Sequence, residues 1–212
     1  MIPVNNFKGI EQQESNLIDN HIIILLLVKP SDDTSSEVIS KFNYLHKKSG
    51  KYCNIYPIGY SENFSNDYDD IQEVNGVENR KWKYSDQCFI EFTSDISKRL
   101  KSWKYVEDIQ VVILQNIVNE GISKLDFTNY ISIDINYGLR KGYIESFAKF
   151  MGYLIVASKS EVEAKEVIKK ANKMRYSYKD ILTAAINSIP KLPKPIKHML
   201  NDRAFYIPSN RR

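Results

Sequence analysis

The chain has 212 residues, of which 42% are hydrophobic and 26% are charged, as in ordinary soluble globular proteins. No apolar run approaches the ~20 residues that a transmembrane helix needs. Met1 to Asn20 has no basic stretch followed by an apolar one, so we predict a cytoplasmic protein without a signal peptide or membrane contact. Two cysteines without a CxxC pattern favour free, buried thiols in a reducing compartment.

Charge is distributed unevenly along the chain. In total there are 30 Lys and Arg against 26 Asp and Glu. Residues 164–212 hold 12 basic and 3 acidic residues, which leaves 18 against 23 for residues 1–163. An acidic body with a basic end predicts either an acidic partner, nucleic acid included, or contact of the end with the body itself.

The first elements follow in chain order. Residues 1–20 are expected to form an arm or a loop that packs late. A continuous apolar run, His21 to Val28, is typical of a strand buried on both faces, as in a parallel sheet. Thr34 to Glu37 matches a capping box, and apolar residues follow at helical spacing. We therefore predict a helix over residues 35–49.

Three more strands and two more helices are predicted downstream. The strands are expected at 52–58, 109–114 and 130–135, and the helices at 85–102 and 144–155. A strand over residues 88–92 is the alternative to the first of these helices. Residues 61–80 are polar and lack periodicity, which is typical of a functional or mobile loop. Residues 161–189 are expected to form helices packed on the core. Residues 190–212 form a basic tail with four prolines, three of them too closely spaced for a helix.

This alternation of strands and helices predicts an α/β core over residues 21–160. The expected sheet is mostly parallel, with about four to five strands and helices on both faces, followed by C-terminal helices. Flavodoxin-like and TIR-like three-layer folds have such an architecture, although the sequence shows no motif of either group.

Ligands of open α/β sheets bind beyond the carboxyl ends of the strands, which selects four loops. These loops are 29–34, 59–62, 115–120 and 136–141. In the first, the hydroxyls of Ser31 and Ser35 and the N–H groups at the helix start could hold an anion.

The neighbouring Asp32 and Asp33 would repel a bare phosphate and would suit a ribose hydroxyl, a metal or a cationic group. A plain capping role for the same residues stays open, since helix N-termini commonly use Ser, Thr and Asp.

The other loops supply further candidate residues. Tyr60 and Glu62 follow the second strand, and Asn136, Arg140 and Lys141 could hold a phosphate or a carboxylate. An ordinary solvated turn is the alternative for that last loop.

Asp32, Asp33 and Glu145 are the candidate catalytic carboxylates. The three histidines lack any metal or triad spacing, so we predict no metal site, and no cofactor can be assigned.

Two functional hypotheses follow. The first is a nucleotide-like or NAD-like small-ligand site at the strand ends, with hydrolase or NADase-type chemistry as one version of it. The second is a non-catalytic interaction or regulatory module that uses the basic C-terminal segment. For the second, a protein partner or a homo-oligomer is favoured over nucleic acid, because no RNA-binding motif is present. The sequence leaves both open.

Overall fold

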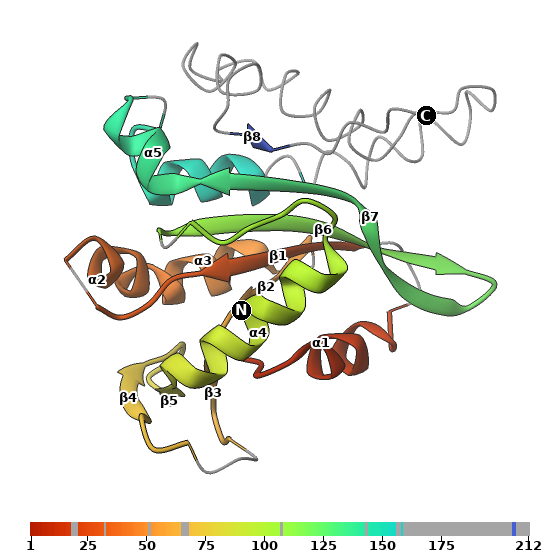
Figure 1. Ribbon diagram of the computed structural model, residues 1–212, viewed down its shortest axis with the longest axis horizontal. Coiled ribbons are helices and arrows are strands. Elements are labelled where there is room, and N and C mark those ends of the chain that lie inside the picture. Colours follow the sequence, from red (N-terminus) through yellow and green to blue (C-terminus); the bar gives the residue numbers. More distant parts are fainter. Residues whose placement is uncertain are drawn as a thin grey trace.

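The computed structural model describes residues 1–17, 21–31, 33–50, 52–64, 68–106, 108–142, 144–155, 158 and 205–206 (Figure 1). The helices are α1 (Phe7–Glu14), α2 (Asp33–Ser40), α3 (Phe42–Ser49), α4 (Asp86–Arg99) and α5 (Ile135–Arg140), with a further helix over residues 147–155. The strands are β1 (His21–Leu27), β2 (Cys53–Pro57), β3 (Tyr60–Ser61), β4 (Gln72–Asn75), β5 (Lys81–Tyr84), β6 (Gln110–Asn119), β7 (Ile122–Asp134) and β8 (Phe205–Tyr206).

The main sheet has the strand order β2-β1-β6-β7-β8, and it corrects the predicted fold class. Among the described strands, β1 and β2 form the one parallel pair, while β1–β6, β6–β7 and β7–β8 are antiparallel. The prediction of a flavodoxin-like or TIR-like fold, with a mostly parallel sheet and helices on both faces, is therefore wrong. A continuous apolar run indicates a strand that is buried on both faces. It does not distinguish a strand of a parallel sheet from an interior strand of an antiparallel sheet.

The hairpin between β6 and β7 is the largest departure from the predicted order. Its two-residue turn, Glu120-Gly121, has positive φ at both positions, 52° and 78°, as a type I′ turn requires. The outer part of the hairpin is largely exposed, so its sequence lacks the apolar alternation that marks a strand. Residues 115–120, predicted as a ligand-binding loop, are therefore mostly strand.

A small antiparallel sheet, β3-β5-β4, includes part of the segment predicted as a loop over residues 61–80, namely Ser61 and the whole of β4. Its core is the buried Trp82, which packs against Tyr60 and Phe42 of α3. Gly76 lies so close that an added Cβ would be 2.6 Å from the Trp82 ring. Aromatic packing on one side of this sheet stabilises it without a continuous apolar run.

The helices confirm part of the prediction. Ser85 caps α4 by accepting a hydrogen bond from the Cys88 N–H at 3.0 Å, as expected. The helix predicted over residues 35–49 is instead divided into α2 and α3 at Lys41. Ser40 Oγ donates to the Glu37 carbonyl at 2.6 Å next to this break, a local bond that competes with the helical ladder.

The N-terminal residues are part of the core rather than a loose arm. Ile2 N–H donates to the Ile55 carbonyl at 2.9 Å, and Val4 forms a parallel bridge with Ile58 beside β2. Phe7 of α1 is buried and packs edge-on against Phe92 of α4. Figure 1 shows these two helices side by side against the main sheet.

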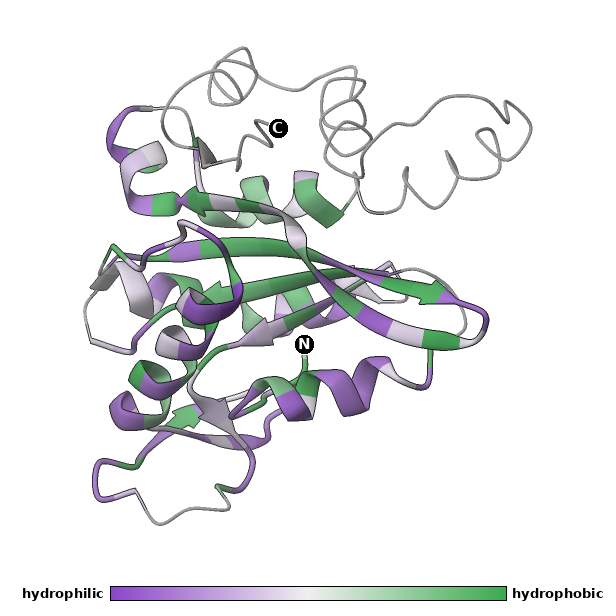
Figure 2. Cartoon of the chain, turned by 45° about the vertical axis from the view of Figure 1, so that its right-hand side comes forward, coloured by the Kyte–Doolittle hydropathy of each residue, from purple (hydrophilic) through white to green (hydrophobic). Residues whose placement is uncertain are grey.

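Hydrophobic residues concentrate on the central strands and polar ones on the outer faces of the helices (Figure 2). Both cysteines are free and buried, as predicted. No helix within the described ranges has the length and apolar character needed to cross a bilayer. The predictions for residues 161–189 and 190–212 lie outside the described residues, except that β8 pairs with β7.

Candidate functional site

A cavity of about 410 Å³ lies between α1, the end of α4 and the β6–β7 hairpin. Its described lining consists of Glu11, Glu14, Ser15, Arg99, Asn116, Ser123, Lys124, Leu125 and Phe127. Glu14, Asn116 and Leu125 are buried and form its inner surface, whereas most of the charged residues are exposed at its mouth. A volume of this order is typical of small-molecule sites.

A second hollow, of about 520 Å³, lies between α2, α3 and β4. Its ionisable lining residues, Glu73 and Lys81, are both exposed. None of its described lining residues is a buried ionisable group, so the smaller cavity is the better candidate for a specific site.

Glu14 is the central residue of this cavity, with a side chain that is only 1% exposed. Its Oε1 accepts hydrogen bonds from the Tyr56 hydroxyl at 2.5 Å and from Asn54 Nδ2 at 2.8 Å. Its Oε2 is also buried, and it has no hydrogen-bond partner among the described residues. One carboxylate oxygen is thus held by two donors, while the other is buried and unpaired.

Burial raises the pKa of Glu14 above its ordinary value, although the bonds from Tyr56 and Asn54 act in the opposite direction. Burial likewise raises the pKa of the Tyr56 hydroxyl, and the neighbouring Glu14 adds to this effect. Tyr56 therefore stays protonated and acts as a donor at any physiological pH. A carboxyl group with a raised pKa inside a cavity is a recurring feature of functional sites.

The sequence places these groups through simple periodicity. Asn6 caps α1, since its side chain accepts a hydrogen bond from the Gly9 N–H at 2.9 Å. Phe7, Ile10 and Glu14 follow at helical spacing on the buried face, so the carboxylate is carried inside with the apolar residues.

The donors come from β2, where Asn54 and Tyr56 are two residues apart and therefore share one face of the strand.

The hairpin fixes the end of α1 from the other side. Asn116 Nδ2 donates to the Glu14 carbonyl at 3.4 Å, and Ser123 Oγ lies 3.0 Å from the same oxygen. Ser123 Oγ is also 2.8 Å from Asn116 Oδ1. The pairing of β6 with β7 shifts register between Ile113 and Gln115, directly before Asn116. Such irregularities commonly redirect side chains next to binding sites.

Two cations lie at the mouth of the cavity. The Arg99 guanidinium is 3.2 Å from Glu11 and is positioned over the rings of Phe7 and Phe127, at 4.6 and 5.3 Å. These contacts hold Arg99 in place. Lys124 is exposed and forms no ion pair with any described residue. Lys124 is therefore the cation that can reach a ligand without breaking an existing contact.

The residues predicted from the sequence lie elsewhere. β1 and β7 end, and β6 begins, at the same end of the main sheet, because Leu27 pairs with Gln110 and Gln110 with Asp134. Three of the four predicted loops, 29–34, 59–62 and 136–141, therefore lie toward this end of the strands. The fourth, 115–120, extends to the opposite end of the sheet, where the Glu14 cavity is.

Of the first-loop candidates, Ser31 is exposed and Ser35 is buried. Asp32 and the side chain of Asp33 lie outside the described residues. Tyr60 is buried and donates to the Val28 carbonyl at 3.1 Å, which ties the second loop to the end of β1.

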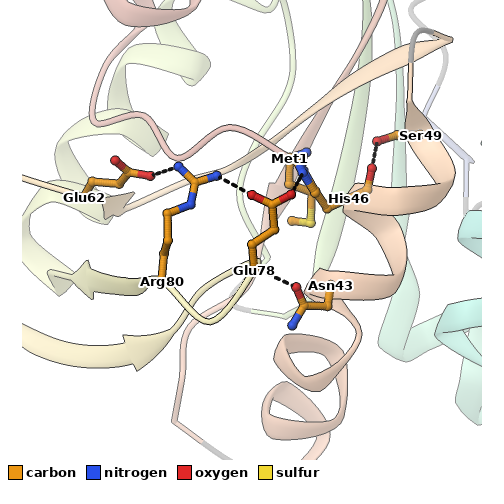
Figure 3. A network of polar contacts seen from close by, with 7 residues as sticks. All are labelled: Met1, Asn43, His46, Ser49, Glu62, Glu78 and Arg80. Atoms are coloured by element: carbon orange, nitrogen blue, oxygen red, sulfur yellow. Dashed lines mark hydrogen bonds and ion pairs between the residues drawn. The ribbon is translucent and has the colours of Figure 1, made fainter.

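Glu62 belongs to a network of polar contacts rather than to a pocket (Figure 3). Its carboxylate is 2.7 Å from Arg80, which also lies 3.3 Å from Glu78. Glu78 in turn contacts His46 of α3 at 3.4 Å, and its N–H donates to Asn43 Oδ1 at 2.6 Å. This network joins the small sheet to α3.

In the last loop, Asn136 Nδ2 donates to Asp108, and Arg140 lies 3.5 Å from the same carboxylate. Lys141 is placed over the ring of Tyr137, at 5.8 Å. Glu145 is exposed and forms an ion pair with Lys149. The structure thus brings Asn136 and Arg140 together at Asp108, a residue that sequence reasoning missed.

Sequence reasoning also missed Glu14, Tyr56 and Asn54, because residues 1–20 were expected to be an arm. The available signal was Asn6 followed by the spacing of Phe7, Ile10 and Glu14.

Comparison with protein-family models found no matching family, and searches of curated proteins and of solved structures found no significant match.

Proposed function

We propose that the protein binds a small hydroxyl-bearing molecule, a nucleoside, a nucleotide or a sugar, in the cavity around Glu14. One observation carries this proposal: Glu14 Oε2 is buried without a described partner while Oε1 of the same carboxyl group accepts two hydrogen bonds. A buried polar atom left unpaired costs about 1–3 kcal/mol, so a ligand group that pairs with it gains that amount.

A hydroxyl group is the best match for this oxygen. Hydroxyls both donate and accept, so they pair with Glu14 whether its carboxyl group is ionised or, with its raised pKa, protonated. An ammonium group would pair well with the ionised form alone, and a carboxylate with the protonated form alone. Carboxylates that hold ribose hydroxyls are a familiar part of nucleotide sites.

The rest of the cavity supports the same ligand class. Leu125 and Phe127 provide an apolar wall against which a sugar or base ring can pack. Lys124 at the mouth could accept a phosphate without losing an ion pair to any described residue. The volume suits one nucleoside or sugar unit, so an NAD-like molecule would place one half in the cavity and the other half outside.

Chemistry on the bound ligand would use the same carboxyl group. A glutamic acid with a raised pKa retains its proton closer to neutrality and can donate it to a leaving oxygen, as general acids of glycoside-cleaving enzymes do. Glu11 lies one turn earlier on α1, but it is exposed and paired with Arg99. The geometry therefore supports binding more directly than it supports hydrolysis.

Calorimetric titration with nucleosides, nucleotides, NAD and simple sugars tests this proposal. Ser15 is exposed at the mouth of the Glu14 cavity, so the large side chain in Ser15→Trp should block the entrance. This variant should no longer bind any compound that releases or absorbs heat on titration into the unmodified protein. Ser40→Trp is the matched control, because Ser40 is also exposed and each serine hydroxyl donates to a carbonyl three residues earlier. No heat from any compound, or equal affinity in the Ser15→Trp variant, would contradict the proposal.

The alternative is an interaction module that uses the basic C-terminal segment. Its support is the excess of basic residues over positions 164–212, of which only β8 is described. Reversing three of the charges, Lys191, Lys194 and Lys197, to Glu should weaken binding to an acidic partner and leave the ligand heat unchanged. Self-association, measured by analytical ultracentrifugation, is the corresponding test for a second copy of the chain.

A further inference from the structure

A cluster of oxygen-bearing side chains lies at the other end of the main sheet, where β6 begins and β7 ends. It consists of Asp108, Gln110, Asp134 and Asn136. Gln110 and Asp134 are directly opposite each other in the β6–β7 pairing, so their side chains are neighbours on the same face. Asn136 Nδ2 donates to Asp108 Oδ1, which joins the start of β6 to α5.

Two of these oxygens are buried without a described partner. Gln110 is only 4% exposed, and its Oε1 accepts no hydrogen bond from the described residues. Asn136 is only half-buried as a residue, but its Oδ1 atom is buried and unpaired, because the amide turns its nitrogen toward Asp108. Two unsatisfied carbonyl oxygens in one cluster are exceptional in a folded protein and call for an explanation.

The cluster is also acidic. Asp134 Oδ1 accepts the Tyr137 N–H at 2.8 Å as the cap of α5, and the Asn136 N–H also interacts with this carboxylate. Among the described residues, Asp108 forms an ion pair with Arg140 at 3.5 Å, and the Arg140 side chain is largely exposed. Two neighbouring carboxylates, together with two unpaired carbonyl oxygens, favour a bound cation.

We propose that Asp108, Gln110, Asp134 and Asn136 bind a hard divalent cation, Ca²⁺ or Mg²⁺. All four groups are oxygen donors of the kind that these ions prefer, and water completes the coordination. None of these four side chains is a His or a Cys, so a softer metal such as zinc is a poor match. This site is independent of the Glu14 cavity, from which it is separated by the length of β6.

The cation site also changes the interpretation of Arg140 and Lys141, which were predicted to hold a phosphate. Asp108 pairs with Arg140, and the surrounding oxygens would repel an anion. When the cation binds, Arg140 is released from Asp108 into solvent, where its exposed position allows it to move.

Titration calorimetry and thermal unfolding with Ca²⁺ and with Mg²⁺, up to about 10 mM of each, test this proposal on the full chain. One ion is expected to bind per chain and to raise the unfolding temperature. The affinities of the two ions decide between them, since Ca²⁺ accepts irregular oxygen sites and Mg²⁺ demands octahedral ones.

Three variants separate binding from folding. Asp134→Asn keeps a side-chain oxygen for the cap of α5 and should weaken cation binding by at least about tenfold, because ligand charge sets the affinity of such sites. Gln110→Leu should weaken binding and make the cation-free protein more stable, since an unpaired buried carbonyl is removed. Glu73→Gln is the control: it removes one exposed carboxylate on β4 and should leave binding unchanged.

Absence of heat and of any thermal shift with both ions would overturn the proposal. So would a folded Asp134→Asn variant, verified by circular dichroism, that binds the cation as tightly as the unmodified chain does. If Gln110→Leu stabilises the protein but retains full affinity, the unpaired carbonyl is only a packing defect and the proposed site is wrong.

Discussion

Replacing Tyr56 by Phe tests the buried carboxyl group of Glu14 most directly. The change removes the hydroxyl that donates to Glu14 Oε1 at 2.5 Å and leaves Asn54 as the remaining described donor. A hydrogen bond to a charged group contributes about 1.5–3 kcal/mol, and one between neutral groups about 0.5–1.5 kcal/mol. The loss of stability should therefore depend on whether Glu14 is ionised.

The direction of the pH dependence follows from linkage. The pKa of Glu14 is higher in the folded protein than in the unfolded chain, so between these two values the folded protein binds more protons. The contribution of Glu14 to stability is consequently constant below the unfolded pKa and falls as pH rises to the folded pKa. Tyr56→Phe raises the folded pKa further, so the decline should extend to higher pH.

Urea unfolding of both proteins between about pH 4 and pH 8 measures this effect. We expect the Tyr56→Phe variant to lose about 1 kcal/mol at the acidic end and about 2–3 kcal/mol at the alkaline end. Tyr60→Phe is the matched control, because the buried Tyr60 hydroxyl donates to a backbone carbonyl, that of Val28, at 3.1 Å. Its cost should be nearly independent of pH.

A loss for Tyr56→Phe that is the same at every pH would refute the reasoning, because Glu14 would then not titrate in the folded protein over that range. A double variant with Glu14→Gln provides the second check. Without an ionisable partner at position 14, the cost of removing the Tyr56 hydroxyl should lose its pH dependence.

Two further predictions concern the scaffold, and both are measured by urea unfolding. Gly76→Ala should cost about 1–3 kcal/mol through overpacking, because its Cβ would lie 2.6 Å from the Trp82 ring. Gly121→Ala should cost only about 1 kcal/mol, since that site has open space and a strained φ of 78°; equal costs would argue against the Trp82 contact. Ser85→Ala should lose about 1 kcal/mol with the α4 cap, and a change within 0.5 kcal/mol would mean that the cap is dispensable.

Local signals in the sequence predicted individual elements well and their assembly poorly. Ser85 with the apolar spacing behind it located α4, and the run from His21 to Val28 located β1. Neither signal contains information on strand direction. The turn at Glu120-Gly121 carried only a weak signal, because Gly121 suits a positive φ but Glu120 is not one of the residues that mark a type I′ hairpin.

The candidate sites were harder to predict for a different reason. Asp108 and Asn136 are far apart in the sequence, and only the pairing of β6 with β7 brings them together. Glu14 and Tyr56 are separated by 42 residues in the sequence. Glu14 also lies on the buried face of α1, where the helical pattern of apolar residues would predict an apolar side chain. A charged residue at a position that periodicity assigns to the core is itself a signal of a site.

The proposed binding function would account for the cost in stability of the Glu14 cluster. A partly satisfied buried polar group is less stable than apolar residues of similar shape, so a core selected for stability alone would favour such residues at positions 14, 54 and 56. The cluster also connects three separate elements, α1, β2 and the β6–β7 hairpin, around one unpaired oxygen. Full pairing of the carboxylate would serve a purely structural anchor better. An acceptor left unpaired beside a cavity is what the proposed binding site would use, because its partner would arrive with the ligand.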